Sequence, residues 1–138
     1  MSAPLRISEA ESRVMAVVWA GDGGPDGMGA AGAEAILAAV GPANGWTDST
    51  VRTLIHRLIR KGALRSERRR GAVVYVALAP REAWVTAEGQ GLLDRLFGGQ
   101  VAGLVDHFTR ERAVSADDLA RLKRLVAELD ADAADEDG

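Results

Sequence analysis

The most regular pattern in the chain lies in the stretch Trp46-Thr-Asp-Ser-Thr-Val-Arg-Thr-Leu-Ile-His-Arg-Leu-Ile-Arg-Lys-Gly-Ala-Leu64. Its apolar residues recur at the spacing of one helix face. They are Val51, Leu54, Ile55, Leu58 and Ile59. Thr47, Asp48 or Ser49 can cap the start of this helix. Gly62 can end it in a left-handed conformation, so the stretch predicts a helix with one buried face.

The opposite face of the same helix holds short hydroxyls, a histidine and long cations. These residues are Ser49, Thr50, Arg52, Thr53, His56, Arg57 and Arg60. In a surface helix that has no binding partner, glutamates one turn away would usually pair with such cations. No acid follows Asp48 on this face, so we expect it to meet a partner that supplies negative charge.

The positive charge of the chain is concentrated in one segment. Eight of the 17 Lys and Arg residues lie between Arg52 and Arg70, where only Glu67 opposes them, although the whole chain has a net charge of −3. A basic segment in an acidic chain is typical of a surface that binds a polyanion. The alternative is a charged helix and hairpin that face solvent.

A β-hairpin is expected directly after the helix. Residues 63–67 form the first strand, Arg68-Arg69-Arg70-Gly71 the turn, and residues 73–78 a β-branched return strand that Pro80 ends. A helix followed by a hairpin with a basic tip predicts a winged helix-turn-helix. The helix then fits the major groove of DNA, and the wing reaches phosphates or the minor groove.

Two further helices are expected before this stretch. Ser8 and Glu11 have the spacing of a capping box, which starts a helix over Glu9 to Ala20. A glycine-rich, flexible connection follows from Gly21, within a loop that extends to Gly32. A short apolar helix then begins near Ala33 and is expected to stop at Gly41-Pro42.

After Pro80 the pattern predicts three amphipathic helices, the last of them capped by Ser115. Helices this short do not easily close a core of their own, so a second copy is expected to cover their apolar stripes. The alternative is that they pack on the N-terminal domain of the same chain. The expected dimerisation residues are Leu92, Leu93, Leu96, Phe97, Val101, Leu104, Val105, Phe108, Leu122, Leu125, Val126 and Leu129.

The expected fold class is therefore mainly α with a small β-hairpin. Residues 1–79 form the winged helix-turn-helix, residues 80–130 the helical dimerisation region, and residues 131–138 an acidic tail expected to be disordered.

Composition argues against enzymes and membrane proteins. The chain has no Cys, and its two histidines, His56 and His107, lack the spacing of a metal site. No phosphate loop, dinucleotide fingerprint or nucleophile elbow is present in the sequence, so no enzymatic activity, cofactor or metal is expected. Neither a signal peptide nor a long apolar run occurs, which favours a cytoplasmic protein.

These motifs resemble the penicillinase-repressor (BlaI/MecI) family. The resemblance lies in Ser8–Trp19, in Trp46–Leu64 and in the wing ending at Val74-Tyr75, and it extends weakly over Leu93–Phe97 and Ser115–Leu129. It implies a homodimeric winged-helix repressor that blocks transcription at palindromic operators. In characterised systems of the family, such repressors control β-lactam-resistance genes and their own operon.

The resemblance also implies roles for single residues. Thr50, Arg52 and Thr53 align with positions that contact DNA in the family, and Arg57 and Lys61 fit phosphate contacts. Arg52 is the expected base reader, since a guanidinium can bond guanine through two hydrogen bonds. The full expected DNA-binding set is Ser49, Thr50, Arg52, Thr53, His56, Arg57, Lys61, Arg68, Arg69 and Arg70.

Control of the repressor is expected at the dimerisation region. In the best-known members a membrane sensor metalloprotease triggers cleavage there at an Asn-Phe bond, and His107-Phe108 stands at that place in this sequence. The changed residue leaves open whether this bond is cleaved. The alternative function is a winged-helix regulator switched by a small ligand, as in MarR-like proteins, with the Gly21–Gly32 loop lining a pocket.

Overall fold

The computed structural model describes residues 6–22 and 28–137 of the chain. It is mostly helical with one small antiparallel sheet, which agrees with the predicted fold class. The chain forms two compact units, one that ends at Gly89 and one that begins at Gln90.

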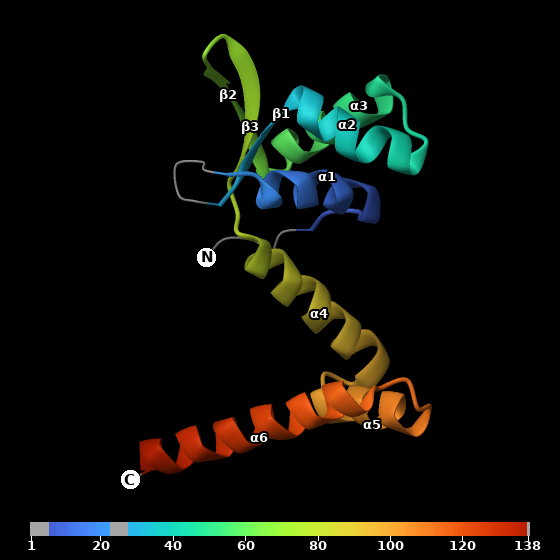
Figure 1. Cartoon of the computed structure of the whole chain (residues 1–138), viewed down its shortest axis with the longest axis vertical. Helices are drawn as coiled ribbons and strands as arrows, with labels where there is room; N and C mark the ends of the chain where they lie inside the picture. The colour runs from blue at the N-terminus through green and yellow to red at the C-terminus, as the bar shows by residue number, and fades with distance from the viewer. Residues whose placement is uncertain (1–5, 23–27, 138) are drawn as a thin grey trace. The chain divides into compact units, whose positions relative to one another are not determined.

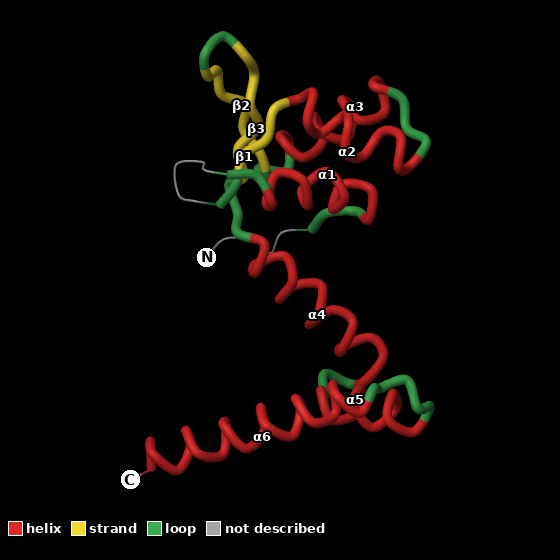
Figure 2. The backbone as a smooth tube through the Cα atoms, in the orientation of Figure 1, coloured by secondary structure: helices red, strands yellow, loops and turns green. Residues whose placement is uncertain are grey.

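The first unit combines three helices with a three-stranded sheet (Figure 1). The helices are α1 (Glu9–Ala20), α2 (Ala33–Asn44) and α3 (Asp48–Arg60), and the strands are β1 (Ala30–Gly32), β2 (Leu64–Arg69) and β3 (Ala72–Ala77). The strand order is β1-β3-β2, and both pairings are antiparallel. The β2–β3 hairpin extends beyond the helices as the wing (Figure 2).

The core of this unit forms where the apolar stripes of the three helices meet the sheet. Its most deeply buried side chains are Val14, Met15, Val18, Ile36, Val51, Ile55, Leu58, Leu64 and Val76. Each contributes about 1.5–3 kcal/mol by leaving water. The predicted stripe of α3 is confirmed, with Val51, Leu54, Ile55 and Leu58 buried and Ile59 partly buried against them.

The predicted caps of α1 and α3 are also confirmed. The Ser8 hydroxyl accepts a hydrogen bond from the Glu11 amide at 3.1 Å, and the Glu11 carboxylate accepts one from the Ser8 amide at 2.7 Å. Thr47 caps α3 by accepting from the Thr50 amide at 3.2 Å. Gly62 has a φ of +79°, as the end of α3 required.

The predicted end of the second helix at Gly41-Pro42 was wrong. Helix α2 continues to Asn44, with Pro42 inside its last turn. A proline there removes only one backbone donor, and the helix ends instead at Gly45, whose φ of +68° is left-handed. The amide of Trp46 then closes the turn by donating to the Gly41 carbonyl at 2.9 Å.

The predicted turn of the hairpin and the predicted Gly21–Gly32 loop each needed one correction. Arg68 and Arg69 belong to strand β2 rather than to the turn, which consists of Arg70 and Gly71, both with positive φ. Such two-residue turns match the twist of the strands they join. Part of the expected Gly21–Gly32 loop is a strand, since β1 pairs with β3 from Ala30↔Val76 to Gly32↔Val74. The five residues 23–27 of that loop lie outside the described residues.

Two glycines allow β1 to approach the end of α1 closely. A Cβ atom at Gly21 would lie 1.9 Å from the carbonyl oxygen of Ala30. One at Gly29, whose φ is +113°, would lie 2.2 Å from the carbonyl oxygen of Val18. Both contacts are with backbone atoms that cannot move aside, so side chains are excluded at these positions.

The remaining helices are α4 (Arg81–Phe97), α5 (Val101–Arg110) and α6 (Ala116–Asp137). Ser115 caps α6, as predicted, by accepting from the Asp118 amide at 3.1 Å. The structure differs from the expected disordered tail, because α6 continues through Asp137. Alanines and the lack of Gly or Pro before Gly138 allow this continuation.

The first residues of α4 belong to the first unit, so the division between the units falls inside this helix and not before it at residue 80. Trp84 accounts for this, since it packs against the first core and its ring lies 5.7 Å from that of Trp19. No helix in the described ranges is long and apolar enough to cross a membrane.

Candidate nucleic-acid interface

The outward face of α3 presents the cations that the sequence predicted. Because the apolar stripe is buried, the opposite face of α3 points to solvent. Its exposed residues are Ser49, Thr50, Arg52, Thr53, His56, Arg57 and Arg60. Within residues 6–22 and 28–137, none of Arg52, Arg57 or Arg60 lies within ion-pair distance of a carboxylate. Arg60 was outside the predicted set, although it shares this face.

The hydroxyls of α3 are partly engaged within the helix itself. The Thr53 hydroxyl donates to the carbonyl of Ser49 at 2.9 Å, which leaves its methyl group and oxygen lone pairs for a ligand. The Thr50 hydroxyl lies 3.1 Å from that of the capping residue Thr47. The Thr50 hydroxyl therefore contacts the cap of α3, whereas the Thr53 hydroxyl bonds within the helix, and both side chains are exposed.

Lys61 differs from the other predicted DNA-binding residues. Its ammonium Nζ lies 2.5 Å from Oε1 of Glu11, a carboxylate on α1 that is almost fully buried. Burial acts to raise the pKa of Glu11, but hydrogen bonds from Lys61 and Ser8 outweigh it and hold the pKa below its usual value. The structure thus directs the charge of Lys61 toward the protein.

Sequence reasoning missed this role of Glu11. The capping box already accounted for an acid at this position, and the partner lies 50 residues away along the chain. No local pattern could have shown the pair.

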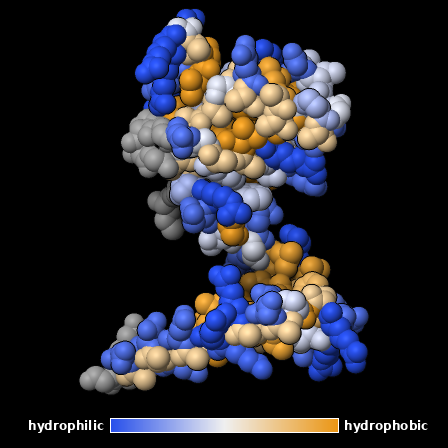
Figure 3. Space-filling view, viewed as in Figure 1, coloured by the Kyte–Doolittle hydropathy of each residue, from blue (hydrophilic) through white to orange (hydrophobic). Residues whose placement is uncertain are grey.

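The wing separates its cations into two groups. Arg65 and Arg69 both face Glu67, with Arg69 Nε 2.7 Å and Arg65 Nη1 3.4 Å from its carboxylate. These contacts, mainly the hydrogen bond from Arg69, lower the pKa of Glu67. Arg68 and Arg70 are exposed and have no carboxylate partner in the part of the chain that the structure describes. Figure 3 shows hydrophilic surface along the hairpin.

The wing and α3 are adjacent parts of one surface element. Only residues 61–63 connect the end of α3 to the start of β2. The connection is held by the amide of Ala63, which donates to the carbonyl of Leu58 at 2.9 Å. A helix that presents cations is therefore followed at once by a hairpin that presents more, which is the arrangement that winged helices use on DNA.

The predicted dimerisation residues form an apolar surface on the second unit. Leu96, Val101, Val126 and Leu129 are each at least 58% exposed. Leu92, Phe108 and Leu125 are exposed to a lesser degree, while Leu93, Phe97, Leu104, Val105 and Leu122 are partly buried. No described residue of this unit reaches the burial of the first core. Hydrophobic surface is visible around the end of α4 and α5 in Figure 3.

The predicted cleavage residues lie in the second half of α5. The rings of His107 and Phe108 meet edge to face at 5.2 Å, and His107 lies 6.1 Å from Phe97. Phe108 is 42% exposed, but its peptide bond is inside a helix.

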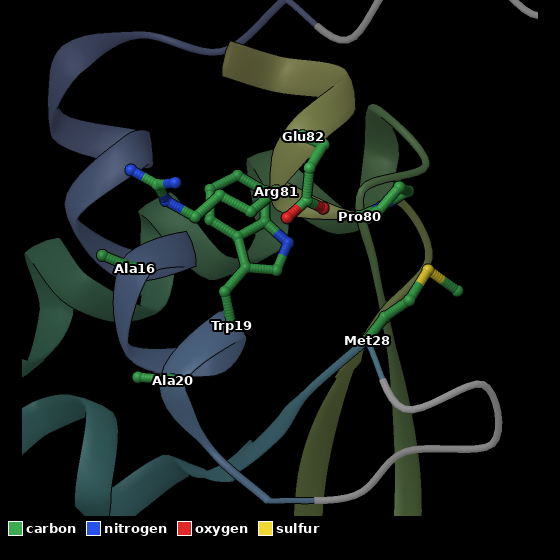
Figure 4. Close-up of a pocket in the computed structure, with 7 residues that line it drawn as sticks. All are labelled: Ala16, Trp19, Ala20, Met28, Pro80, Arg81 and Glu82. Carbon is green, nitrogen blue, oxygen red and sulfur yellow. The ribbon is translucent and has the colours of Figure 1, made fainter. Parts of the chain in front are cut away.

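A pocket of about 510 Å³ lies between α1 and the start of α4 (Figure 4). Trp19 contributes an aromatic ring, Met28 a thioether, and Arg81 and Glu82 opposite charges. The remaining lining residues are Ala16, Ala20 and Pro80. Within the described residues, no group of three or more His, Cys, Asp or Glu side chains is placed to hold a metal ion.

Comparison with known proteins assigns this arrangement to a family. The sequence profile described as penicillinase repressor matches residues 7–128. A protein of Latilactobacillus sakei, described as an uncharacterized 16.5 kDa protein in the ptsI 3′ region, is 31% identical over 87% of this chain and 77% of its own length. The penicillinase repressor of Bacillus licheniformis is 23% identical over 89% of this chain and 91% of its own.

A solved structure is also similar. The solution structure of the monomeric form of Bacillus licheniformis BlaI, in complex with the blaP half-operator, is 25% identical in sequence. The match covers 60% of this chain and 93% of that one, with a TM-score of 0.48.

Proposed function

The chain belongs to the penicillinase repressor family of DNA-binding transcriptional repressors, and from this premise we propose that it acts as a homodimer on palindromic operator DNA. The observation that carries the proposal is the outward face of α3, where exposed cations lack carboxylate partners among the described residues. Cations of this kind favour binding to DNA, because each one that neutralises a phosphate releases a condensed counterion.

Arg52 is the proposed base reader, because it is exposed in the first half of α3. The N-terminal residues of a recognition helix are the ones that contact base edges. Ser49, Thr50 and Thr53 surround it and add shorter polar and methyl contacts. His56 and Arg57, about one turn further along α3, are proposed to contact phosphates. Arg68, Arg69 and Arg70 on the wing add affinity that does not depend on sequence.

The homodimer is proposed to form through the second unit. Its exposed leucines, valines and phenylalanine would lose contact with water on pairing, at about 25 cal/mol for each Å² of apolar surface. Two copies also present two recognition helices, which a palindromic operator requires.

Release from the operator is proposed to follow loss of the dimer, and the regulated genes to be of the β-lactam-resistance type. A membrane sensor metalloprotease acting at His107-Phe108 would have to unwind α5 locally, since a helical peptide bond does not fit an extended protease cleft. The protein should be incubated with a sensor metalloprotease of the proposed kind, under inducing conditions. A chain that stays intact would count against the proteolytic route.

The test of DNA recognition is a mobility shift on the promoter region upstream of its own gene, across a salt series. Wild-type protein is compared with Arg52→Ala. We expect tight, salt-sensitive binding to a palindromic site, and a loss of about 1–3 kcal/mol in the variant. Equal, weak binding to every DNA would reduce the function to non-specific association. If a confirmed dimer binds no DNA at low salt, the proposed repressor function is refuted.

A second candidate is a winged-helix regulator switched by a small ligand. The pocket beside Trp19 favours it, because Arg81 and Glu82 offer polar contacts next to apolar walls. Thermal-shift screening of small aromatic acids would test this candidate. A ligand that raises the melting temperature and also weakens DNA binding would support it.

A further inference from the structure

The contact between Glu11 and Lys61 ties the start of α1 to the end of the recognition helix. Glu11 is 2% exposed, whereas the side chain of Lys61 is 42% exposed. One oxygen of Glu11, Oε1, accepts both the Lys61 ammonium at 2.5 Å and the Ser8 amide at 2.7 Å. The carboxylate is thus held from two sides.

This geometry is unfavourable for a phosphate contact by Lys61. An ammonium within hydrogen-bonding distance of a buried carboxylate already has a counter-charge. Moving it to a phosphate would leave Glu11 charged, buried and paired only with Ser8, which costs free energy. Arg57, one turn earlier on α3, has no such constraint among the residues that the structure describes.

The same pair is a polar contact between α1 and the end of α3. The contacts between α1 and α3 are otherwise apolar, and apolar packing is not directional. A hydrogen-bonded ion pair is directional and acts at the last turn of the helix, where a small rotation would displace the base-reading residues at the other end.

We propose that Glu11 is a positioning residue for DNA recognition, which orients the recognition helix through Lys61, and that Lys61 does not contact DNA. This inference rests on the proposed function. It changes the role that the sequence suggested for Lys61, and it adds a residue of α1 to those that determine operator affinity.

Three variants separate this role from its alternatives. Glu11→Gln keeps an acceptor for the Ser8 amide, because glutamine also serves in a capping box, but it removes the charge that binds Lys61. Lys61→Met removes the cation and keeps an apolar stem. Ser8→Ala is the matched control, since it weakens the cap of α1 and leaves the Glu11–Lys61 pair in place.

The experiment measures operator affinity across a salt series at a temperature where circular dichroism shows every variant folded. We expect Glu11→Gln and Lys61→Met each to lower affinity by about 3- to 10-fold, and the double variant no further, as for residues that act through one contact. Ser8→Ala should bind as wild type does. The dependence of log affinity on log salt should keep its slope in all variants.

Three results would overturn the inference. The first is a slope reduced by about one for each protomer in Lys61→Met, which is the mark of a lost phosphate contact. The second is unchanged affinity in Glu11→Gln. The third is an equal loss in Ser8→Ala, which would show that affinity follows the stability of α1 alone. Wild-type protein that binds no DNA would instead refute the proposed function, and the inference with it.

Discussion

The indole rings of Trp19 and Trp84 lie 5.7 Å apart with their planes tilted by 31°, which joins the end of α1 to the first turn of α4. The Trp19 N–H donates to the carbonyl of Ala79 at 2.9 Å. The Trp84 N–H is buried and has no acceptor among the described residues. The pair therefore combines favourable ring packing with one polar group that has lost its hydration.

Two substitutions of Trp84 should consequently have different effects on stability. Trp84→Ala removes the ring contact and should lower the free energy of unfolding by about 2–3 kcal/mol, since the side chain is only partly buried. Trp84→Phe keeps an aromatic ring and removes the buried N–H, so it should change stability by less than about 1 kcal/mol. Urea denaturation measures both. Equal losses would show that the N–H has an acceptor.

The helices of the first unit were predictable because the residues that determine them lie close to one another in the sequence. The stripe from Val51 to Ile59 repeats at helical spacing, and the cap residues Ser8 and Thr47 act within three positions of their partners. The cationic face of α3 was predictable for the same reason. Once the stripe is buried, the residues between its members must face solvent.

Two of the features that were missed depend on contacts distant in sequence. Strand β1 consists of Ala30, Ala31 and Gly32, which have no strand preference, and it forms because β3 offers an edge to pair with. The engagement of Lys61 by Glu11 likewise needs the folded arrangement of α1 and α3. The course of α2 through Pro42 was missed for a local reason, since proline usually ends a helix, whereas here the left-handed Gly45 ends it.

Glu11 predicts how stability depends on pH. Its pKa in the folded protein is lowered from 4.5, so the folded state favours the ionised carboxylate. This contribution is fully present above pH 4.5 and is lost as the pH falls through the folded-state pKa. At neutral pH, Glu11→Gln should lower the free energy of unfolding by about 1–2 kcal/mol, because Lys61 is partly solvated.

Denaturant titrations of the wild type and Glu11→Gln from neutral to acidic pH would test this dependence. The difference between the two proteins should shrink below pH 4.5 and vanish once Glu11 is protonated. A difference that stays constant across the range would mean that the substitution acts by packing and not by charge.

The arginines of the wing should differ in how much they contribute to DNA affinity, according to whether they pair with Glu67. Arg68→Ala and Arg70→Ala should each lower affinity equally for operator and unrelated DNA, and should reduce the salt slope by about one for each protomer. Arg69→Ala should have a smaller effect, since Glu67 already neutralises that guanidinium. Glu67→Gln should raise affinity for all DNA by releasing Arg65 and Arg69. Mobility shifts on both DNAs provide the measurement, and an effect confined to the operator would assign base reading to the wing.

The exposed apolar residues of the second unit should matter for assembly of the dimer and little for folding of the chain. Leu96 and Leu129 are 65% and 67% exposed, so an aspartate at either position would meet water in a monomer but would be buried without a partner in a dimer. Leu129→Asp should therefore shift sedimentation toward the monomer and leave the helical circular dichroism unchanged. Ala120→Asp is the matched control, since Ala120 is exposed on the opposite side of α6 from its apolar stripe. Operator affinity should fall with the dimer, because a monomer contacts one half-site only. If Leu129→Asp and Ala120→Asp sediment alike as dimers, the interface lies elsewhere, and the stripe of α6 would require a different partner.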